Sequence, residues 1–245
     1  MEEITNKDVC IVIPIYKDNI NNPLLYDEVE SIYHTIKVFK ENDIYFLCQP
    51  NLNISFYKRF EGYNIYFKFY NYNNRAEYSN MCLSYQFYDL FKRYKYMLIC
   101  QTDAWVFKNE LLYWCNKGYD YIGALALFSE IKPKWIGKFG DENIGDIHSY
   151  KYPVLNGGFS LRNIKSMYDF CYKNKDKFKN ETFNEDCVIC WYHWNELNMP
   201  PLEEAIKFSA ENQTYAYYPK YYDQLPFGCH TRKTKFKLIN IFTKK

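Results

Sequence analysis

The sequence predicts an α/β fold in which one mostly parallel β-sheet is flanked by helices on both faces of a single domain. The first observation is a continuous apolar run from Val9 to Tyr16, which is typical of a strand buried on both faces. The second is that strand-like and helix-like segments alternate up to about residue 125. The third is the length of 245 residues, which one hydrophobic core can still support. Ligands of such sheets bind at the carboxyl ends of the strands.

The first half of the chain carries the alternation most clearly. Apolar runs bounded by polar residues predict strands, and apolar residues at helical spacing predict helices. After the first strand, the predicted order is a helix over Asp27–Lys40, strands over Asp43–Cys48 and Asn64–Phe69, a long amphipathic helix over Tyr78–Tyr94, and a strand over Tyr96–Cys100. We expect residues 9–125 to form the nucleotide-binding half of the domain.

The second half is less regular. A stretch over 128–152, which contains Trp135, is rich in Gly, Lys, Asp and aromatic residues, and its length makes it a candidate lid. A strand at Gly158–Arg162 and helices at Lys165–Lys177 and Asn184–Leu197 follow. We expect residues 126–231 to form the acceptor-binding, catalytic half, and residues 232–245 to form a basic tail.

Composition narrows the function classes. A net charge of +2, spread along the chain, gives no basic surface for nucleic acid, so no nucleic-acid partner is expected. The acidic N-terminus lacks the pattern of a secretion signal, and no apolar run reaches the roughly 20 residues needed to span a bilayer, so we expect a cytoplasmic protein. The nine cysteines are then reduced, and Cys187 and Cys190 are predicted to lie on the buried face of a helix rather than to bind zinc.

The residues after the first strand argue against two common nucleotide-binding motifs. Neither a dinucleotide glycine motif nor a P-loop is present, because the chain reads Pro14-Ile-Tyr-Lys-Asp18. A bound nucleotide would therefore be held by side chains and a metal ion. Asp103 follows another apolar strand, and a carboxylate at a strand end can hold a divalent cation against a diphosphate. The alternative is an Asp that caps a turn.

Two further segments carry potential chemistry. Paired glycines in Asn156–Arg162 allow a ligand to approach the backbone closely. In Asn184–Asp186, an acidic pair at a helix start is stabilised by the helix dipole, which is expected to keep Asp186 ionised as a general base. The alternatives are a tight turn and a helix cap.

Six short motifs, taken in chain order, resemble those of a family known only as a domain of unknown function. GT-A-like members of that family occur in bacterial polysaccharide gene clusters. The similarity runs from about Val9 to His230. The motifs are Gln101-Thr-Asp103, Tyr121-Ile-Gly-Ala124, Asn156-Gly-Gly-Phe-Ser-Leu-Arg162, Asn184-Glu-Asp186, Phe208-Ser-Ala-Glu211 and Phe227-Gly-Cys-His230. They also parallel inverting galactosyl- and N-acetylhexosaminyl-transferases. The resemblance implies a GT-A-like, Rossmann-type, mixed but mostly parallel sheet in a single domain.

The resemblance also assigns roles to residues. It implies that Asp186 is the base and that Glu185 binds sugar hydroxyls, while Asp103 and His230 bind Mn²⁺ or Mg²⁺. Metal dependence stays open, because Gln101 replaces the first Asp of the metal triplet. The donor nucleotide sugar is expected to contact Pro14, Ile15, Tyr16, Arg75, Gln101, Thr102, Asp103, Asn156, Gly157 and Gly158, with Arg162 in a diphosphate or structural ion-pair role.

These roles imply a glycosyltransferase that moves a hexose or N-acetylhexosamine, with inversion, from a UDP-sugar to a glycan or lipid-linked acceptor in surface polysaccharide synthesis. Two alternatives are a sugar nucleotidyltransferase and a non-catalytic module that binds carbohydrate or nucleotide. The tail over 232–245 has six basic and no acidic residues, interleaved with apolar ones. It is expected either to contact the inner face of the membrane peripherally or to be a solvated tail or edge strand.

Overall fold

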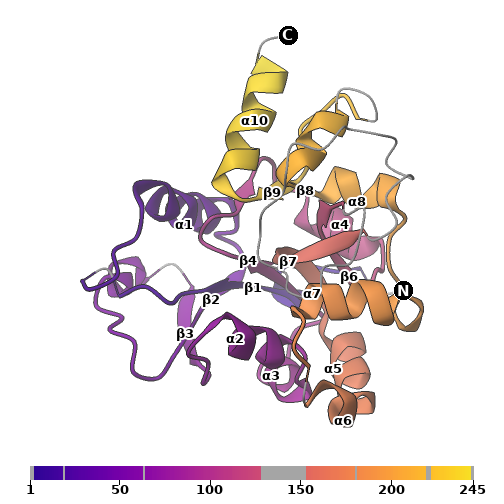
Figure 1. Cartoon of the computed structure of the whole chain (residues 1–245). Coiled ribbons are helices and arrows are strands. Elements are labelled where there is room, and N and C mark those ends of the chain that lie inside the picture. The colour runs from indigo at the N-terminus through magenta and orange to yellow at the C-terminus, as the bar shows by residue number, and fades with distance from the viewer. Residues whose placement is uncertain are drawn as a thin grey trace.

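The computed structural model describes residues 3–18, 20–62, 64–127, 153–179, 181–218 and 222–243. Within these ranges the strands form one mixed sheet of nine, in the order β3-β2-β1-β4-β7-β6-β8-β9-β5. Helices cover both faces, with α1 and α4 above the sheet and α2, α3, α5 and α6 below it in Figure 1. The predicted single-domain α/β fold is confirmed.

The strands are β1 (Val9–Pro14), β2 (Asp43–Cys48), β3 (Ile65–Phe69), β4 (Tyr96–Cys100), β5 (Trp105–Val106), β6 (Tyr121–Ala126), β7 (Val154–Asn163), β8 (Ser209–Glu211) and β9 (Gly228–His230). The α-helices are α1 (Tyr26–Val38), α2 (Arg75–Cys82), α3 (Tyr85–Asp89), α4 (Leu111–Asn116), α5 (Ile164–Lys173), α6 (Lys175–Phe178), α7 (Glu185–Cys187), α8 (Leu202–Phe208) and α10 (Arg232–Thr243). Shorter turns are the 3₁₀ helices η1 (Asn6–Asp8), η2 (Tyr57–Phe60), η5 (Trp194–Glu196) and η6 (Asn212–Tyr217), and the π-helix η4 (Val188–Tyr192).

The parallel half of the sheet has the strand order β3-β2-β1-β4, which also occurs in doubly wound α/β folds. Strand β1 pairs in parallel with β2 on one side and β4 on the other. Every residue of β1 is buried, because its side chains alternate between two cores. Val9, Ile11 and Ile13 pack in the core that contains α1 residues, and Cys10 and Val12 in the core that contains α2 and α3 residues.

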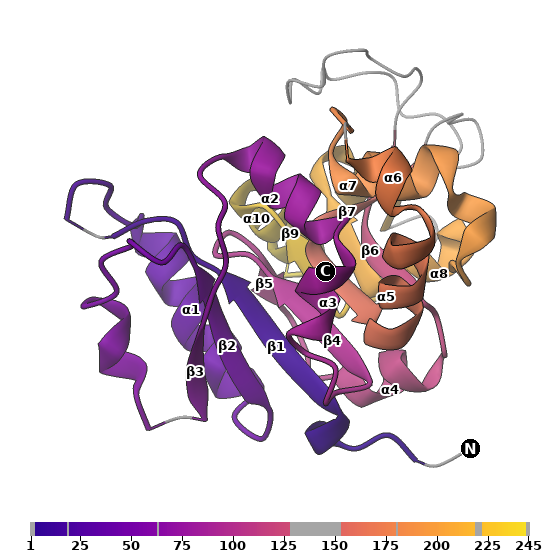
Figure 2. The same cartoon turned by 90° about the horizontal axis from the view of Figure 1, so that it is seen from below.

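The second half of the sheet turns back toward the same edge. Strand β7 runs antiparallel to both β4 and β6, so its amino end lies beside the carboxyl end of β4. Strands β8 and β9 continue parallel to β6. Figure 2 shows that β1 runs away from the N-terminus toward the side on which α2 and α7 lie. Loops from both halves therefore meet at the carboxyl edge of the sheet.

Helices predicted as continuous are divided in the structure. The segment 78–94 contains α3 and the end of α2, and 165–177 contains most of α5 and the start of α6. Ser84 Oγ donates to the Met81 carbonyl at 2.7 Å, and Asn174 Nδ2 donates to the Phe170 carbonyl at 3.1 Å. Such side chains compete with the helical backbone and favour a break. The predicted helix over 184–197 is likewise split into α7, η4 and η5.

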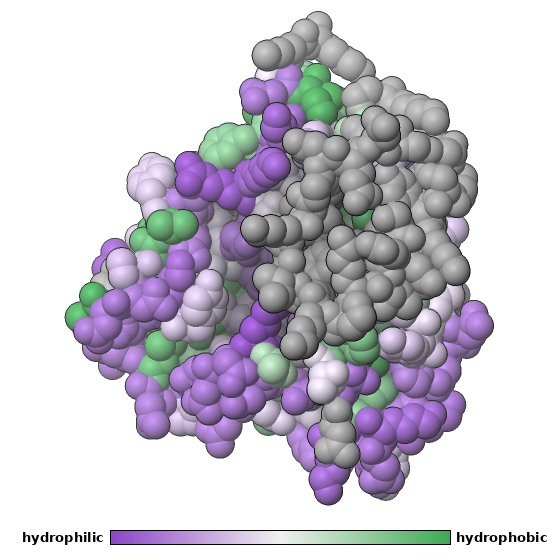
Figure 3. Space-filling view, viewed as in Figure 1, coloured by the Kyte–Doolittle hydropathy of each residue, from purple (hydrophilic) through white to green (hydrophobic). Residues whose placement is uncertain are grey.

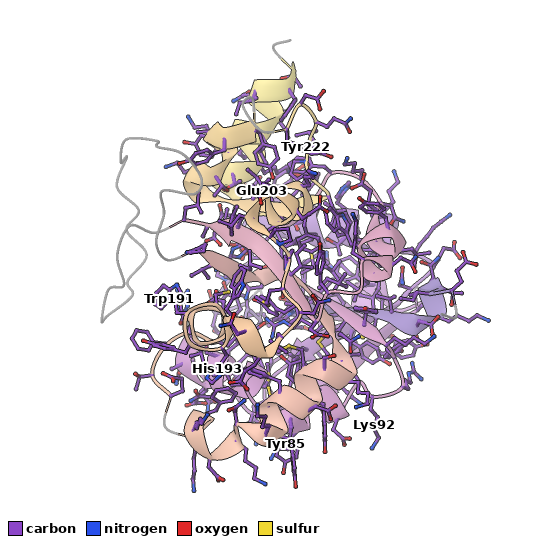
Figure 4. All side chains as sticks on the ribbon, turned by 90° about the vertical axis from the view of Figure 1, so that its right-hand side faces the viewer. Tyr85, Lys92, Trp191, His193, Glu203 and Tyr222 are labelled. Atoms are coloured by element: carbon purple, nitrogen blue, oxygen red, sulfur yellow. The ribbon has the colours of Figure 1, made fainter. Side chains whose placement is uncertain are left out.

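Aromatic contacts hold these short helices together. The Tyr85 ring of α3 lies edge to face against Tyr168 and Tyr172 of α5, at 5.5 and 5.1 Å between centroids (Figure 4). Cys187 and Cys190 are buried in α7 and η4, as predicted for a helical face. The candidate lid over 128–152 lies outside the described residues.

The basic C-terminal segment is a helix rather than the predicted tail or edge strand. Leu238 of α10 is buried, and Lys235 Nζ pairs with Glu30 Oε2 of α1 at 2.8 Å. Lys235 Nζ also lies 3.3 Å from the ring centroid of Trp105, and Arg232 pairs with Asp27. Acidic residues of α1 thus anchor the helix, and its contact with a membrane stays a prediction. Among the helices of the described ranges, none combines the length and apolarity needed to cross a membrane.

Candidate active site

The predicted site residues converge at the carboxyl edge of the sheet. Strand β4 ends directly before Gln101, whose backbone N–H donates to the Gly158 carbonyl at 2.8 Å. Strands β8 and β9 end at Glu211 and His230, which are register neighbours. Figure 3, drawn from the same side as Figure 1, shows hydrophilic residues gathered at the middle of this face. The fold therefore brings together motifs that are far apart in the sequence.

A histidine cluster, formed by Gln101, Asp103, Glu211 and His230, occupies one part of this edge. His230 Nε2 lies 3.3 Å from Asp103 Oδ1 and 3.2 Å from Gln101 Oε1. Its Nδ1 lies 3.3 Å from Glu211 Oε2. His230 is nearly buried, whereas 44% of the Asp103 side chain is exposed. The cluster is therefore open to solvent on its Asp103 side.

The charges of the histidine cluster support one another. Burial disfavours the charged imidazolium, but the carboxylates of Asp103 and Glu211 raise the pKa of His230 well above its ordinary value. Burial likewise opposes ionisation of Asp103, but the facing His230 lowers its pKa below the ordinary value. At neutral pH the cluster therefore holds an imidazolium next to an ionised carboxylate.

Gly158 makes room for His230. A Cβ atom added at Gly158 would lie 2.3 Å from His230 Nε2, a contact that only a shift of the ring could relieve. The Asn156 side chain fixes this part of β7, because its Oδ1 accepts from the Gly158 backbone N–H at 2.8 Å. At this glycine the structure thus shows close packing against a side chain, and the approach of a ligand to the paired glycines stays a prediction.

An arginine cluster, formed by Ser79, Tyr88, Arg162 and Glu185, lies next to the histidine cluster. Arg162 Nη2 pairs with Glu185 Oε1 at 3.2 Å, and Arg162 Nη1 donates to Tyr88 Oη at 3.0 Å. Ser79 Oγ donates to Glu185 Oε2 at 3.0 Å. The Arg162 and Glu185 side chains are 0% and 6% exposed. Of its two predicted roles, Arg162 therefore has the structural ion pair.

Gly157 packs against the arginine cluster as Gly158 packs against His230. A Cβ atom at Gly157 would lie 2.3 Å from Glu185 Oε1 and 2.7 Å from Arg162 Nη2. Because both carboxylate oxygens of Glu185 already have protein partners, this residue holds β7 and α7 together. Its contact with sugar hydroxyls stays a prediction.

Asp186 is buried between the two clusters. Its Oδ1 accepts from the Cys187 N–H at 2.8 Å, and its Oδ2 faces the Gly157 N–H at 3.3 Å. Burial, followed by the charges of Glu185 and Glu211, raises the pKa of Asp186 to about 7. The helix start therefore does not hold the pKa of Asp186 at its ordinary value, because desolvation outweighs the helix dipole, and the role of Asp186 as general base stays a prediction. A carboxyl group with a pKa near 7 is suited to accept a proton at neutral pH.

The loop after β1 contributes a group that the sequence did not single out. Lys17 Nζ pairs with Glu28 Oε2 of α1 at 2.6 Å, and Thr102 Oγ1 donates to Glu28 Oε1 at 3.1 Å. Tyr16 beside it is 54% exposed. Pro14 and Ile15 are buried, so Tyr16 is the residue of the predicted nucleoside contacts that presents its side chain to solvent. Thr102 is buried, and its hydroxyl is used in the hydrogen bond to Glu28.

Arg75 is placed differently from the other predicted residues. It is exposed as the first residue of α2, and the structure gives it no contact with either cluster. Glu211 was part of a quoted motif without a role, and Lys17 and Glu28 lay outside every motif. Glu211 ends the short buried strand β8, and Asp103 follows the buried strand β4 by three residues. A carboxylate at the carboxyl end of a buried strand is the signal that could have identified Glu211.

The residues present fit a divalent cation that is held together with a diphosphate. Within the described ranges, no three His, Cys, Asp or Glu side chains are grouped so as to hold a metal by themselves. Gln101 Oε1 and Asp103 Oδ1, however, lie 3.2 and 3.3 Å from His230 Nε2, near the roughly 3 Å expected between adjacent ligands of an octahedral cation. Phosphate oxygens would complete such a shell, and the imidazolium would release its proton.

Solved structures define the class of fold. The chain is similar to the glycosyltransferase GlyE of Streptococcus pneumoniae TIGR4, with a TM-score of 0.53 and 12% identity over 97% of this chain and 64% of that one. Mouse xyloside xylosyltransferase 1 matches with a TM-score of 0.51 and 11% identity over 92% and 97%. Core-mannan synthase A of Aspergillus fumigatus, in an Mn/GDP form, matches with a TM-score of 0.50 and 11% identity over 75% and 68%. The chain thus has the GT-A glycosyltransferase fold.

The sequence identifies the family to which the chain belongs. Residues 62–230 match the family described as "Protein of unknown function (DUF5672)", and the chain belongs to that family. No curated protein sequence matches the chain.

Proposed function

We propose that this protein is a glycosyltransferase that moves a sugar from a nucleoside diphosphate donor to a hydroxyl acceptor. The fold shared with three glycosyltransferases supports the class of reaction. One observation carries the proposal to this chain. Asp103 and His230 meet at the carboxyl edge, and Asp186 lies nearby with a pKa of about 7.

The donor would lie across the histidine cluster. Tyr16 would stack on the nucleobase, because an exposed ring at the end of β1 offers a flat apolar surface. Asp103, His230 and Gln101 would hold Mn²⁺ or Mg²⁺, which when bound neutralises charge on the diphosphate. The Mn/GDP form of core-mannan synthase A supports a cation in this fold. We propose uridine diphosphate as the nucleotide, and a hexose or N-acetylhexosamine as the sugar.

The chemical step is a single displacement at the anomeric carbon. The acceptor oxygen forms a bond to that carbon as the bond to the diphosphate oxygen breaks, and the nucleoside diphosphate leaves with the electron pair. Asp186 takes the acceptor proton. Its carboxylate faces two backbone N–H groups, which leaves lone pairs for a hydroxyl. Arg162 and Ser79 hold the neighbouring Glu185 and so keep α7 in place. A single displacement of this kind inverts the configuration at the anomeric carbon.

The acceptor we propose is a glycan or a lipid-linked glycan of a surface polysaccharide, such as a capsule or lipopolysaccharide chain. Incubation with a panel of nucleotide sugars and candidate acceptors, followed by mass spectrometry and NMR of the product, tests the proposal. A new glycosidic bond of inverted configuration is expected. A sugar nucleotidyltransferase would instead release pyrophosphate from a nucleoside triphosphate, and a non-catalytic module would bind without turnover.

A further inference from the structure

Lys17 occupies the carboxyl edge of the sheet without a role in the proposed mechanism. It follows β1 by three residues, and β1 lies directly beside β4, which leads into Asp103. We infer that Lys17 binds the diphosphate of the donor and that Glu28 holds it in position. This inference rests on the proposed function and adds a residue to its donor site.

Hydrogen bonds from buried side chains hold the backbone around Lys17 in place. Tyr57 Oη donates to the Lys17 carbonyl at 2.7 Å, and Tyr72 Oη donates to the Ile15 carbonyl at 3.2 Å. Both tyrosines are buried. A phosphate-binding side chain needs such a rigid base, because a fixed donor loses less conformational entropy when the ligand binds.

Glu28 connects Lys17 to the histidine cluster. It is buried in the first turn of α1, with Oε2 accepting from Lys17 Nζ at 2.6 Å and from the Leu25 N–H at 2.7 Å. Its Oε1 accepts from Thr102 Oγ1, the residue before Asp103. A helix Glu that orients a phosphate-binding Lys is an arrangement known from protein kinases.

Lys17 has bonding capacity left for a ligand. Its ammonium carries three N–H donors, and within the described residues it makes one hydrogen bond, to Glu28. The side chain is 14% exposed. Arg162, by contrast, is fully buried and paired with Glu185. Because Gln101 leaves the metal position with one negative charge fewer, a lysine at this edge would contribute directly to neutralising the diphosphate.

Binding measurements on paired ligands test the inference. Calorimetry would compare uridine, guanosine, adenosine and cytidine diphosphates with the matching nucleosides, on wild type, Lys17→Met and Lys17→Arg. We expect Lys17→Met to weaken binding of the preferred diphosphate by about 10- to 100-fold, since a charged hydrogen bond is lost. Binding of the nucleoside should change less than about threefold, and Lys17→Arg should keep most of the affinity for the diphosphate.

The matched control is Lys117→Met. Lys117 also pairs with a carboxylate, Glu204, at 3.2 Å, and its side chain is more exposed than that of Lys17, at 33% against 14%. It lies before the amino end of β6, which is the opposite edge of the sheet. This variant should bind the diphosphate as wild type does. If Lys17→Met does not fold, Lys17→Gln keeps a hydrogen-bond donor for Glu28 without the charge and serves the same test.

The outcomes separate the two proposals. If wild type binds a diphosphate and Lys17→Met binds it equally well, the pair with Glu28 is structural and the inference is wrong. Equal weakening of nucleoside and diphosphate would also overturn it, because the loss would then reflect a disturbed fold. Failure of wild type to bind any nucleoside diphosphate would contradict the proposed function itself, and the inference with it.

Discussion

The two neighbouring glycines of β7 face two clusters of opposite character. Gly157 packs against the arginine cluster, in which the side chains of Arg162 and Glu185 are 0% and 6% exposed. Gly158 packs against the histidine cluster, in which 44% of the Asp103 side chain is exposed. The first cluster satisfies its charges internally, and the second reaches solvent. One strand therefore carries a sealed, structural charge pair beside an open one that can accept a ligand.

The two clusters divide stability and reactivity between them. A buried ion pair is retained only where hydrogen bonds satisfy both partners, as Tyr88 and Ser79 do here. Asp186 lies between the clusters, and its pKa is raised by burial, by Glu185 of the sealed cluster and by Glu211 of the open one. Each cluster thus acts on the proposed base, and substitutions in one cluster at a time should separate their contributions.

The largest effect is expected for Asp186→Asn, which removes the proposed base. Transfer should fall by about 10²- to 10⁴-fold, the usual contribution of a general base. Donor binding should stay within a few-fold of wild type, because Asp186 has no part in the histidine cluster. Initial rates and donor affinity would be measured on the same preparation. If donor binding is lost while turnover is unchanged, Asp186 binds the donor and is not the general base.

Arg162→Met should break the sealed cluster and cost about 3–5 kcal/mol in the free energy of unfolding, because it leaves Glu185 buried without its partner. Urea denaturation at pH 7 measures the change. The control is Lys165→Met, since Lys165 pairs with Asp169 on the exposed face of α5. That variant should lose less than about 0.5 kcal/mol. Similar losses in the two variants would mean that the Arg162 pair is not a structural anchor.

The pH dependence of stability should reveal the position of Asp186. Its pKa is about 7 in the folded protein and about 3.9 in the unfolded chain. Between these values the folded state holds a proton that the unfolded state has released, so stability should fall as pH rises from about 4 to 7. The slope from this group should approach 1.4 kcal/mol per pH unit. Urea denaturation of wild type and Asp186→Asn across this pH range isolates the contribution of Asp186. If the difference in unfolding free energy between the two proteins does not change with pH, the raised pKa is contradicted.

The smallest effects should come from the two glycines. Gly157→Ala and Gly158→Ala should each cost about 1–3 kcal/mol, because the added methyl group meets a packed side chain. Only Gly158→Ala, which displaces His230, should also weaken binding of UDP with Mn²⁺. Denaturation and calorimetry on both variants would test this contrast. Equal weakening of UDP binding by the two would mean that the clusters are not separate in function.

Much of the fold could be predicted from sequence because its strands are continuous apolar runs. Apolar runs predict β1, β2 and β4, and the order of short motifs predicts that Asp103 and His230 share a site, where the structure places His230 Nε2 3.3 Å from Asp103 Oδ1. The breaks at Ser84 and Asn174 were missed, because each depends on a local side-chain hydrogen bond that competes with an otherwise helical pattern.

The finer features of the site depend on contacts that sequence order does not reveal. The pair of Lys17 and Glu28 forms only because the end of β1 and the start of α1 fold onto each other. The raised pKa of Asp186 depends on its burial and on Glu211, which arrives from a distant strand. The contact of the helix over 232–243 with α1 is made by ion pairs between residues far apart in the sequence.

The open cluster is proposed to bind a nucleoside diphosphate together with a divalent cation. The most direct measurement is the thermal transition of wild type, Asp103→Asn and His230→Ala against nucleoside diphosphates and nucleotide sugars, with Mn²⁺, Mg²⁺ or a chelator. Since a ligand that binds the folded state raises stability by mass action, wild type should be stabilised by UDP or a UDP-sugar when the cation is present. Both variants should lose that shift. A transition in wild type that no nucleotide moves under any of these conditions would contradict the account.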